Sequence, residues 1–133
     1  MPDAELPKVL GVIALGGVLG SLARYGLAEA FPHRAGGFPW STFAINVIGC
    51  FAIGVLLAAL TPLSHPLLRP FLGTGILGGF TTFSTFAVDT ERLLPAHPVV
   101  ALVYFFGTLA AALVATYLGG AVTRIAGSGS LRR

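Results

Sequence analysis

Four long apolar segments constrain the fold of this chain more than any other feature of its sequence. They run over about residues 8–29, 40–60, 70–88 and 99–123. Only the first of them is interrupted by a charged residue, Arg24. A helix that crosses a bilayer needs about 20 mostly apolar residues. The sequence therefore predicts an all-α integral membrane protein, with four transmembrane helices in a single domain over residues 1–133.

The remaining sequence leaves little room for a water-soluble part. Charged residues make up 10% of the chain, whereas a soluble domain carries about 25%. The connections between the apolar segments are short and rich in proline, which stops helices. The first residues, MPDAELPK, lack the order of a signal peptide, so we expect the first segment to stay in the membrane. The polar end, AGSGSLRR, is expected to fray.

The basic residues leave the orientation in the membrane open, although cytoplasmic loops normally carry the excess of Lys and Arg. The N-terminus, second connection and C-terminus hold five of them, and the other side holds three. Without the two arginines at the end of the chain, the count is three against three. A chain with so little bias can insert in both orientations, or in one orientation set by other factors. The two groups are Lys8, Arg69, Arg124, Arg132 and Arg133, and Arg24, Arg34 and Arg92.

Small residues at a spacing of four let membrane helices approach closely. Gly16 and Gly20 form such a pair in the first segment, and Gly75 and Gly79 form one in the third. Because four short helices enclose little interior, we expect a homo-oligomer, most simply a dimer. The alternative, which does not exclude a dimer, is that these glycines pack helices within one chain.

Asn46 is the only carboxamide in any apolar segment, and Thr42 shares its helix face. A buried amide in hydrocarbon is costly unless it is paired. Its role is therefore either a hydrogen bond between helices or a donor of two hydrogens to an anion. Tyr104, Thr108 and Thr116 form a polar stripe on the fourth segment, although threonines there commonly bond to their own helix carbonyls.

The apolar segments contain no Asp, Glu, Lys or His near their middle. Proton-coupled carriers usually need such an ionisable group, so the sequence disfavours a small multidrug exporter. All three histidines lie in connections beside prolines, and no nucleophile and base are paired, so we do not expect an enzyme. Scattered basic residues also disfavour nucleic-acid binding. Arg24 either extends to the membrane interface or draws anions to a vestibule.

The third segment contains GGFTTFSTF at 78–86, with two glycines, four hydroxyls and three phenylalanines. Gly78 and Gly79 followed by β-branched threonines make a poor helix interior, which predicts a break. A break would free backbone carbonyls, which suit a small cation. The edges of aromatic rings carry partial positive charge and can contact a small anion weakly. For the phenylalanines, the alternative is packing in the core or against lipid.

Three stretches resemble one known family, the CrcB-type or Fluc fluoride channels. GGVLGSLARY (16–25) is similar to its first-helix signature, and TFAINVIGC (42–50) to the second-helix stretch with a pore asparagine. GILGGFTTFSTF (75–86) resembles the family's most specific motif. The resemblance covers nearly the whole chain. Two positions depart from the family pattern: Ala112 stands where a hydroxyl is often found, and Asp89 where a glutamate is common.

The resemblance implies an antiparallel, dual-topology homodimer with two fluoride pores and a third helix broken in mid-membrane. It implies a central structural Na⁺, held by the backbone carbonyls of Gly78 and Thr81 from each subunit. It maps the pore asparagine onto Asn46 and the pore phenylalanines onto Phe83 and Phe86. The other expected path residues are Thr42, Ser84, Thr85, Tyr104, Thr108 and Thr116, with Arg24 at a vestibule.

The function that follows is passive export of fluoride through the inner (plasma) membrane, without turnover chemistry. The expected partners are fluoride, sodium, a second copy of the chain and the lipid bilayer. A structural or regulatory membrane subunit is the remaining alternative, since glycine-rich helices alone would allow it.

Overall fold

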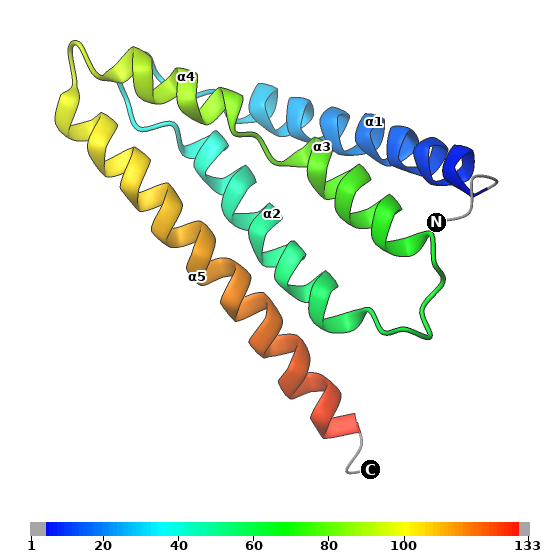
Figure 1. Cartoon of the computed structure of the whole chain (residues 1–133). Helices are drawn as coiled ribbons and strands as arrows, with labels where there is room; N and C mark the ends of the chain where they lie inside the picture. The colour runs from blue at the N-terminus through cyan, green and yellow to red at the C-terminus, as the bar shows by residue number, and fades with distance from the viewer. Residues whose placement is uncertain (1–4, 131–133) are drawn as a thin grey trace.

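The computed structural model describes residues 5–130, and these residues form helices and connections without a β-strand. The elements follow one another along the chain with short connections (Figure 1). They are α1 (Leu6–Ala30), α2 (Trp40–Ala59), the π-helix η1 (Arg69–Leu77), α3 (Gly78–Phe80), α4 (Ser84–Leu93) and α5 (Pro98–Ser130).

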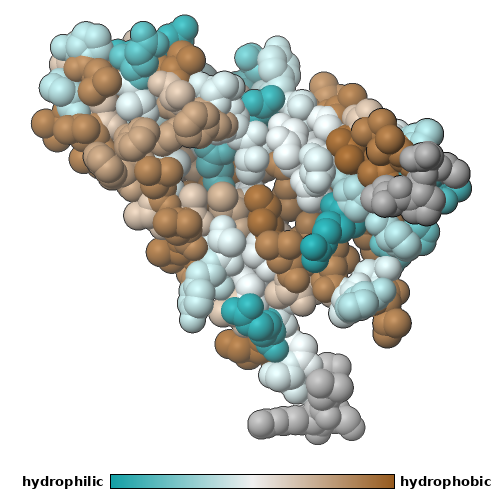
Figure 2. Space-filling model, viewed as in Figure 1, coloured by the Kyte–Doolittle hydropathy of each residue, from teal (hydrophilic) through white to brown (hydrophobic). Residues whose placement is uncertain are grey.

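Four helical stretches are long and apolar enough to cross a membrane: α1, α2, the run from Arg69 to Leu93, and α5. This confirms the predicted all-α class and, among residues 5–130, four helices that are able to span a membrane. Large apolar side chains are exposed along these helices, because lipid rather than water is their expected surroundings. Figure 2 shows brown, hydrophobic residues over much of one face, with teal residues gathered near its ends.

The third and fourth helical stretches run further than expected. Residues 89–93 were predicted to lie in a connection but belong to α4, because Glu, Arg and Leu favour helix and the next proline is Pro95. The predicted fraying is wrong for residues 126–130, which continue α5. Extending a formed helix adds one hydrogen bond for each residue fixed, which offsets weak intrinsic preference. The remaining tail residues, including Arg132 and Arg133, lie outside the described residues.

The helices pair in an interleaved order. α1 packs along η1 and α3, whereas α2 packs along α5 (Figure 1). The glycine pairs make the first of these contacts: a methyl group added at Gly16 would lie 2.6 Å from the carbonyl oxygen of Phe71. One added at Gly79 would lie 2.5 Å from the carbonyl oxygen of Gly17. These glycines therefore pack helices within one chain, as the alternative reading held.

The contact between α2 and α5 is also made through small residues. A methyl group at Gly54 would meet the backbone of Thr116, and one at Gly119 would meet the backbone of Phe51. Backbone atoms cannot rotate away as a flexible side chain can. Both helix pairs thus depend on backbones in direct contact, the packing mode typical of membrane helices.

Candidate functional site

The helical hydrogen-bond pattern of the third stretch is interrupted between Phe80 and Ser84. Thr81 has an extended backbone, with φ −77° and ψ 155°, and α4 starts three residues after it. The break was expected where Gly78 and Gly79 are followed by threonines; the glycines themselves are helical. Gly79 instead provides the close approach to α1, so the interruption falls on residues 81–83 that follow the glycines.

Asn46 of α2 takes over the backbone hydrogen bonds of Thr82 in this interruption. Its Nδ2 donates to the carbonyl oxygen of Thr82 at 2.9 Å, and its Oδ1 accepts from the Thr82 amide at 2.9 Å. Both residues are buried. The amide therefore makes the hydrogen bond between helices that the sequence allowed. It also has a second Nδ2 hydrogen, which bonds to no other described residue.

The interruption leaves backbone carbonyls without partners. The Thr82 amide is used by Asn46, and the Thr85 amide donates to Thr82 Oγ1 at 3.1 Å. Consequently, the carbonyl oxygens of Gly78 and Thr81 accept no hydrogen bond from any of residues 5–130. The Gly79 carbonyl accepts one from Ser21 Oγ of α1, at 3.4 Å. Unpaired carbonyls at membrane depth are tolerated only where they line a cavity or bind something.

Polar residues of α2 and α5 are also buried. Thr42, Tyr104 and Thr108 are almost inaccessible. The Tyr104 hydroxyl donates to Asp89 Oδ2 of α4 at 3.3 Å, whereas Thr108 Oγ1 has no partner among the described residues. Thr116 donates back to the Ala112 carbonyl of its own helix, as the alternative for this residue held. The stripe on α5 is therefore not uniform, and Thr108 is its unpaired member.

The two phenylalanines mapped to the pore differ in their surroundings. Phe86 is 3% exposed and stacks on Phe105, with ring centroids 5.3 Å apart, whereas Phe83 is 75% exposed. The two rings still contact each other, with centroids 5.9 Å apart. Ser84 and Thr85, which follow Phe83, are also exposed. The candidate residues therefore fall into a buried set and an exposed set. A single chain leaves the exposed set, Phe83, Ser84 and Thr85, uncovered.

Arg24, the candidate vestibule residue, lies on α1 and is half-buried. The one ion pair among residues 5–130 joins Lys8 and Glu5, so Arg24 is in no ion pair within the described part.

Comparison with known proteins decides the family. The sequence model described as "CrcB-like protein, Camphor Resistance (CrcB)" matches residues 11–120. The chain belongs to the CrcB-like family. The four apolar helices and this membership identify a multi-pass membrane protein.

Several CrcB-like relatives match most of the chain. It is 48% identical over 130 residues to "Fluoride-specific ion channel FluC 2" of Nocardia farcinica, covering 96% of this chain and 92% of that protein. It is 54% identical over 104 residues to the protein of that name from Streptomyces avermitilis, covering 76% and 66%. The "Fluoride-specific ion channel FluC" of Paracoccus denitrificans is 45% identical over 113 residues, covering 84% and 91%. These relatives are named as ion channels, which agrees with the expectation that the protein is not an enzyme.

Asp89 of this CrcB-like protein is a buried residue beside the candidate site that the sequence interpretation did not select. From the sequence it was placed only at the end of the third span, whereas in the structure it is 7% exposed and accepts a hydrogen bond from Tyr104. Phe86, Asp89 and Leu93 are the buried residues of α4, at a spacing of three and four. This helical period is visible in the sequence and would have placed Asp89 on the inward face.

Replacing Tyr104 by phenylalanine is expected to destabilise the CrcB fold by about 1–3 kcal/mol, because the buried Asp89 carboxyl loses its donor. Thermal unfolding in detergent measures the effect. Tyr117→Phe is the matched control, since Tyr117 lies on the same helix and is 69% exposed. Equal unfolding temperatures for the two variants would show that the hydrogen bond does not support the fold.

Proposed function

We propose that this protein is a fluoride-selective channel that lets fluoride leave the cell passively. The observation that carries this proposal is the 48% identity to a protein named as a fluoride-specific ion channel, over 96% of the chain. The geometry supports it, because Asn46 places a neutral donor beside the interruption of the third span, and the Thr108 hydroxyl is a buried donor without a partner among residues 5–130. Neutral donors bind a strongly hydrated anion and still allow it to leave.

The conducting unit is an antiparallel, dual-topology homodimer with two pores. One chain leaves Phe83, Ser84 and Thr85 exposed and the Gly78 carbonyl unpaired, a costly arrangement at membrane depth unless a second subunit covers it. The nearly even distribution of basic residues supports insertion in both orientations. In this arrangement the interruption of the third span lies near mid-membrane, where two subunits meet.

A sodium ion lies at the centre of this dimer and is bound by backbone oxygens. The carbonyl groups of Gly78 and Thr81 fit this role, because they accept no hydrogen bond from residues 5–130 and carbonyl oxygens are hard ligands. Two subunits would supply four such oxygens. The bound ion would compensate the unpaired carbonyls and hold the two subunits together.

The protein's own side chains form the fluoride path. The second Nδ2 hydrogen of Asn46 and the Thr108 hydroxyl act as donors, with Phe83 and Phe86 presenting ring edges. Arg24 raises the anion concentration at the entrance. Each contact is weak compared with that of a buried positive charge, so the ion passes from one to the next. The remaining hydroxyls expected along the path are those of Thr42, Ser84, Thr85, Tyr104 and Thr116.

Ion efflux from liposomes that hold the purified protein tests this function. A fluoride electrode records fluoride release, and a chloride electrode records chloride under the same gradient. We expect fast fluoride release with chloride release at the level of empty liposomes. A folded protein that releases neither ion would refute the proposal and leave the structural subunit as the explanation.

Phe83→Ile and Phe86→Ile are each expected to slow fluoride efflux about tenfold, because an aliphatic side chain has no electropositive edge. Phe106→Ile is the control, since Phe106 is an exposed phenylalanine of α5 outside the proposed path. Size-exclusion chromatography separates a pore effect from the loss of core packing expected at the buried Phe86. Wild-type efflux in both Phe83 and Phe86 variants would rule out the ring-edge contact.

A further inference from the structure

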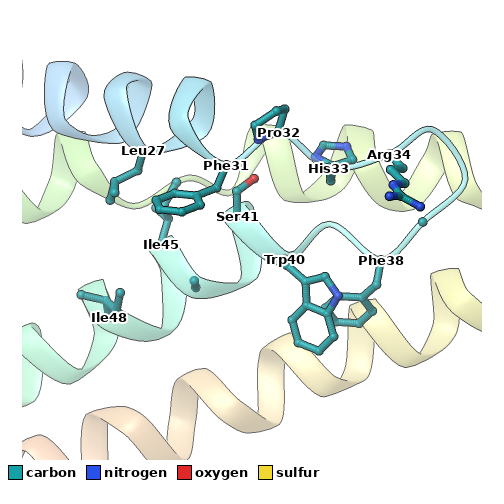
Figure 3. Close-up of a pocket in the computed structure, with 12 residues that line it drawn as sticks. Leu27, Phe31, Pro32, His33, Arg34, Phe38, Trp40, Ser41, Ile45 and Ile48 are labelled. Carbon is teal, nitrogen blue, oxygen red and sulfur yellow. The ribbon is translucent and has the colours of Figure 1, made fainter.

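A groove lies where α1 and α2 diverge, beneath the connection between them (Figure 3). Its volume is about 650 Å³. It exists because the two helices that meet at this connection pack against different partners, α1 against η1 and α3, and α2 against α5. None of the residues proposed for the fluoride path lines this groove.

The groove changes from polar to apolar along its length. Figure 3 shows His33 and Arg34 on the connection at one end and Leu27 and Ile48 at the other. The exposed ring of Trp40 lies near the polar end, which suits the level of lipid headgroups, where tryptophan is enriched. The groove therefore runs from the expected headgroup level toward the hydrocarbon.

The positive charge of Arg34 at the polar end favours an anion. Arg34 and His33 line the groove, and no acidic residue does. The backbone turns tightly here, with the Gly37 amide donating to the Arg34 carbonyl at 2.9 Å and Gly36 at φ +77°. Arg34 forms no ion pair with any described residue, so its guanidinium remains free for a partner from outside the chain.

We propose that this groove binds an anionic phospholipid, with the phosphate at Arg34 and an acyl chain along Leu27 and Ile48. Charge complementarity favours a lipid over a second copy of the chain. A parallel copy would bring a second Arg34 to the groove. An antiparallel copy would bring the opposite end of the molecule, where Lys8, Arg69 and Arg124 outnumber the one described acidic residue, Glu5, which is already paired with Lys8.

Native mass spectrometry of the purified protein tests the proposal, with phosphatidylglycerol or phosphatidylcholine of identical acyl chains added to the detergent. We expect the protein to retain several times more phosphatidylglycerol. Arg34→Gln is expected to lower this retention about fivefold, the effect of one arginine on an anionic headgroup. Arg92→Gln is the matched control, because Arg92 lies at the same end of the molecule but outside this groove.

A second variant tests where the lipid sits. Ala44 is exposed and lines the groove, so Ala44→Trp fills the space without disturbing the buried core. We expect it to release both lipids while the chromatographic elution of the protein stays unchanged. Ala44→Cys, made in a Cys50→Ala background, tests for a second copy, and we expect it to remain free of disulfide-linked dimers.

The proposal is overturned by equal retention of the two lipids, by equal effects of Arg34→Gln and Arg92→Gln, or by wild-type retention in Ala44→Trp. Rapid disulfide formation through Ala44→Cys would also overturn it and assign the groove to a second copy. Lipid retention is read without any ion flux, so this proposal and fluoride conduction can each fail without the other.

Discussion

Replacing Asn46 by aspartate is expected to lower fluoride efflux about a hundredfold. The side chain keeps its shape, but it gains an acceptor where Nδ2 donates to the Thr82 carbonyl. If it is ionised, it repels the anion by about 3 kcal/mol, for a separation of about 5 Å and an effective dielectric constant of about 20. Efflux from liposomes with matched amounts of protein measures the change.

Asn46→Leu separates the two causes of this loss. Leucine is similar in size and removes both hydrogen bonds to Thr82 without adding charge. We expect Asn46→Leu to conduct measurably faster than Asn46→Asp, provided that both elute from size exclusion like the wild type. If the two variants conduct equally slowly, the hydrogen bonds rather than the charge explain the loss. Normal efflux in Asn46→Asp would remove Asn46 from the path.

Replacing Gly20 by alanine is expected to destabilise the fold by about 3 kcal/mol or more, enough to lose most of the folded protein during purification. The added methyl group would overlap the carbonyl group of Ile76 and crowd the amide of Phe80. Overpacking costs about 1–3 kcal/mol where side chains can adjust. Here the contact is between backbones, so α1 must move away from η1 and α3 as a whole.

Gly26→Ala is the matched control for this prediction. It lies on the same helix, and a methyl group there would meet nothing within 4 Å. Alanine is the better helix former by about 0.5–1 kcal/mol, so we expect this variant to be as stable as the wild type or slightly more stable. Opposite signs for the two substitutions, measured by thermal unfolding in detergent, are the expected result. Two stable variants would show that the close approach of α1 to η1 is wrong.

The four helices could be predicted from the sequence because a bilayer imposes a length and a polarity that few other structures need. The ends of the helices were less certain, since α4 includes the charged residues that follow Val88. The partners of the glycines could not be predicted either. A spacing of four identifies a helix face suited to close contact, but it does not say whether the contact is with the same chain or another.

The candidate site was only partly visible in the sequence. Asn46 could be selected because it is the only carboxamide in an apolar segment. Its partner, the backbone of Thr82, lies 36 residues away and is set by how α2 packs against the interruption. A break was expected in the stretch of two glycines followed by threonines, but the sequence did not show which residues would leave the helix: the structure uses Gly79 for the contact with α1 and interrupts the helix after Phe80.

The interleaved pairing of the helices has a consequence for biosynthesis. α1 pairs with η1 and α3, and α2 pairs with α5, so the two members of each pair are separated along the chain by another membrane helix. The first member of each pair therefore waits for its partner while that intervening helix is synthesised. The N-terminal segments leave the ribosome first, so α1 and α2 enter the bilayer before either has that partner. Native packing can be completed only when α5 has been synthesised. A chain truncated before α5 would leave α2 unpaired and exposed to membrane quality control.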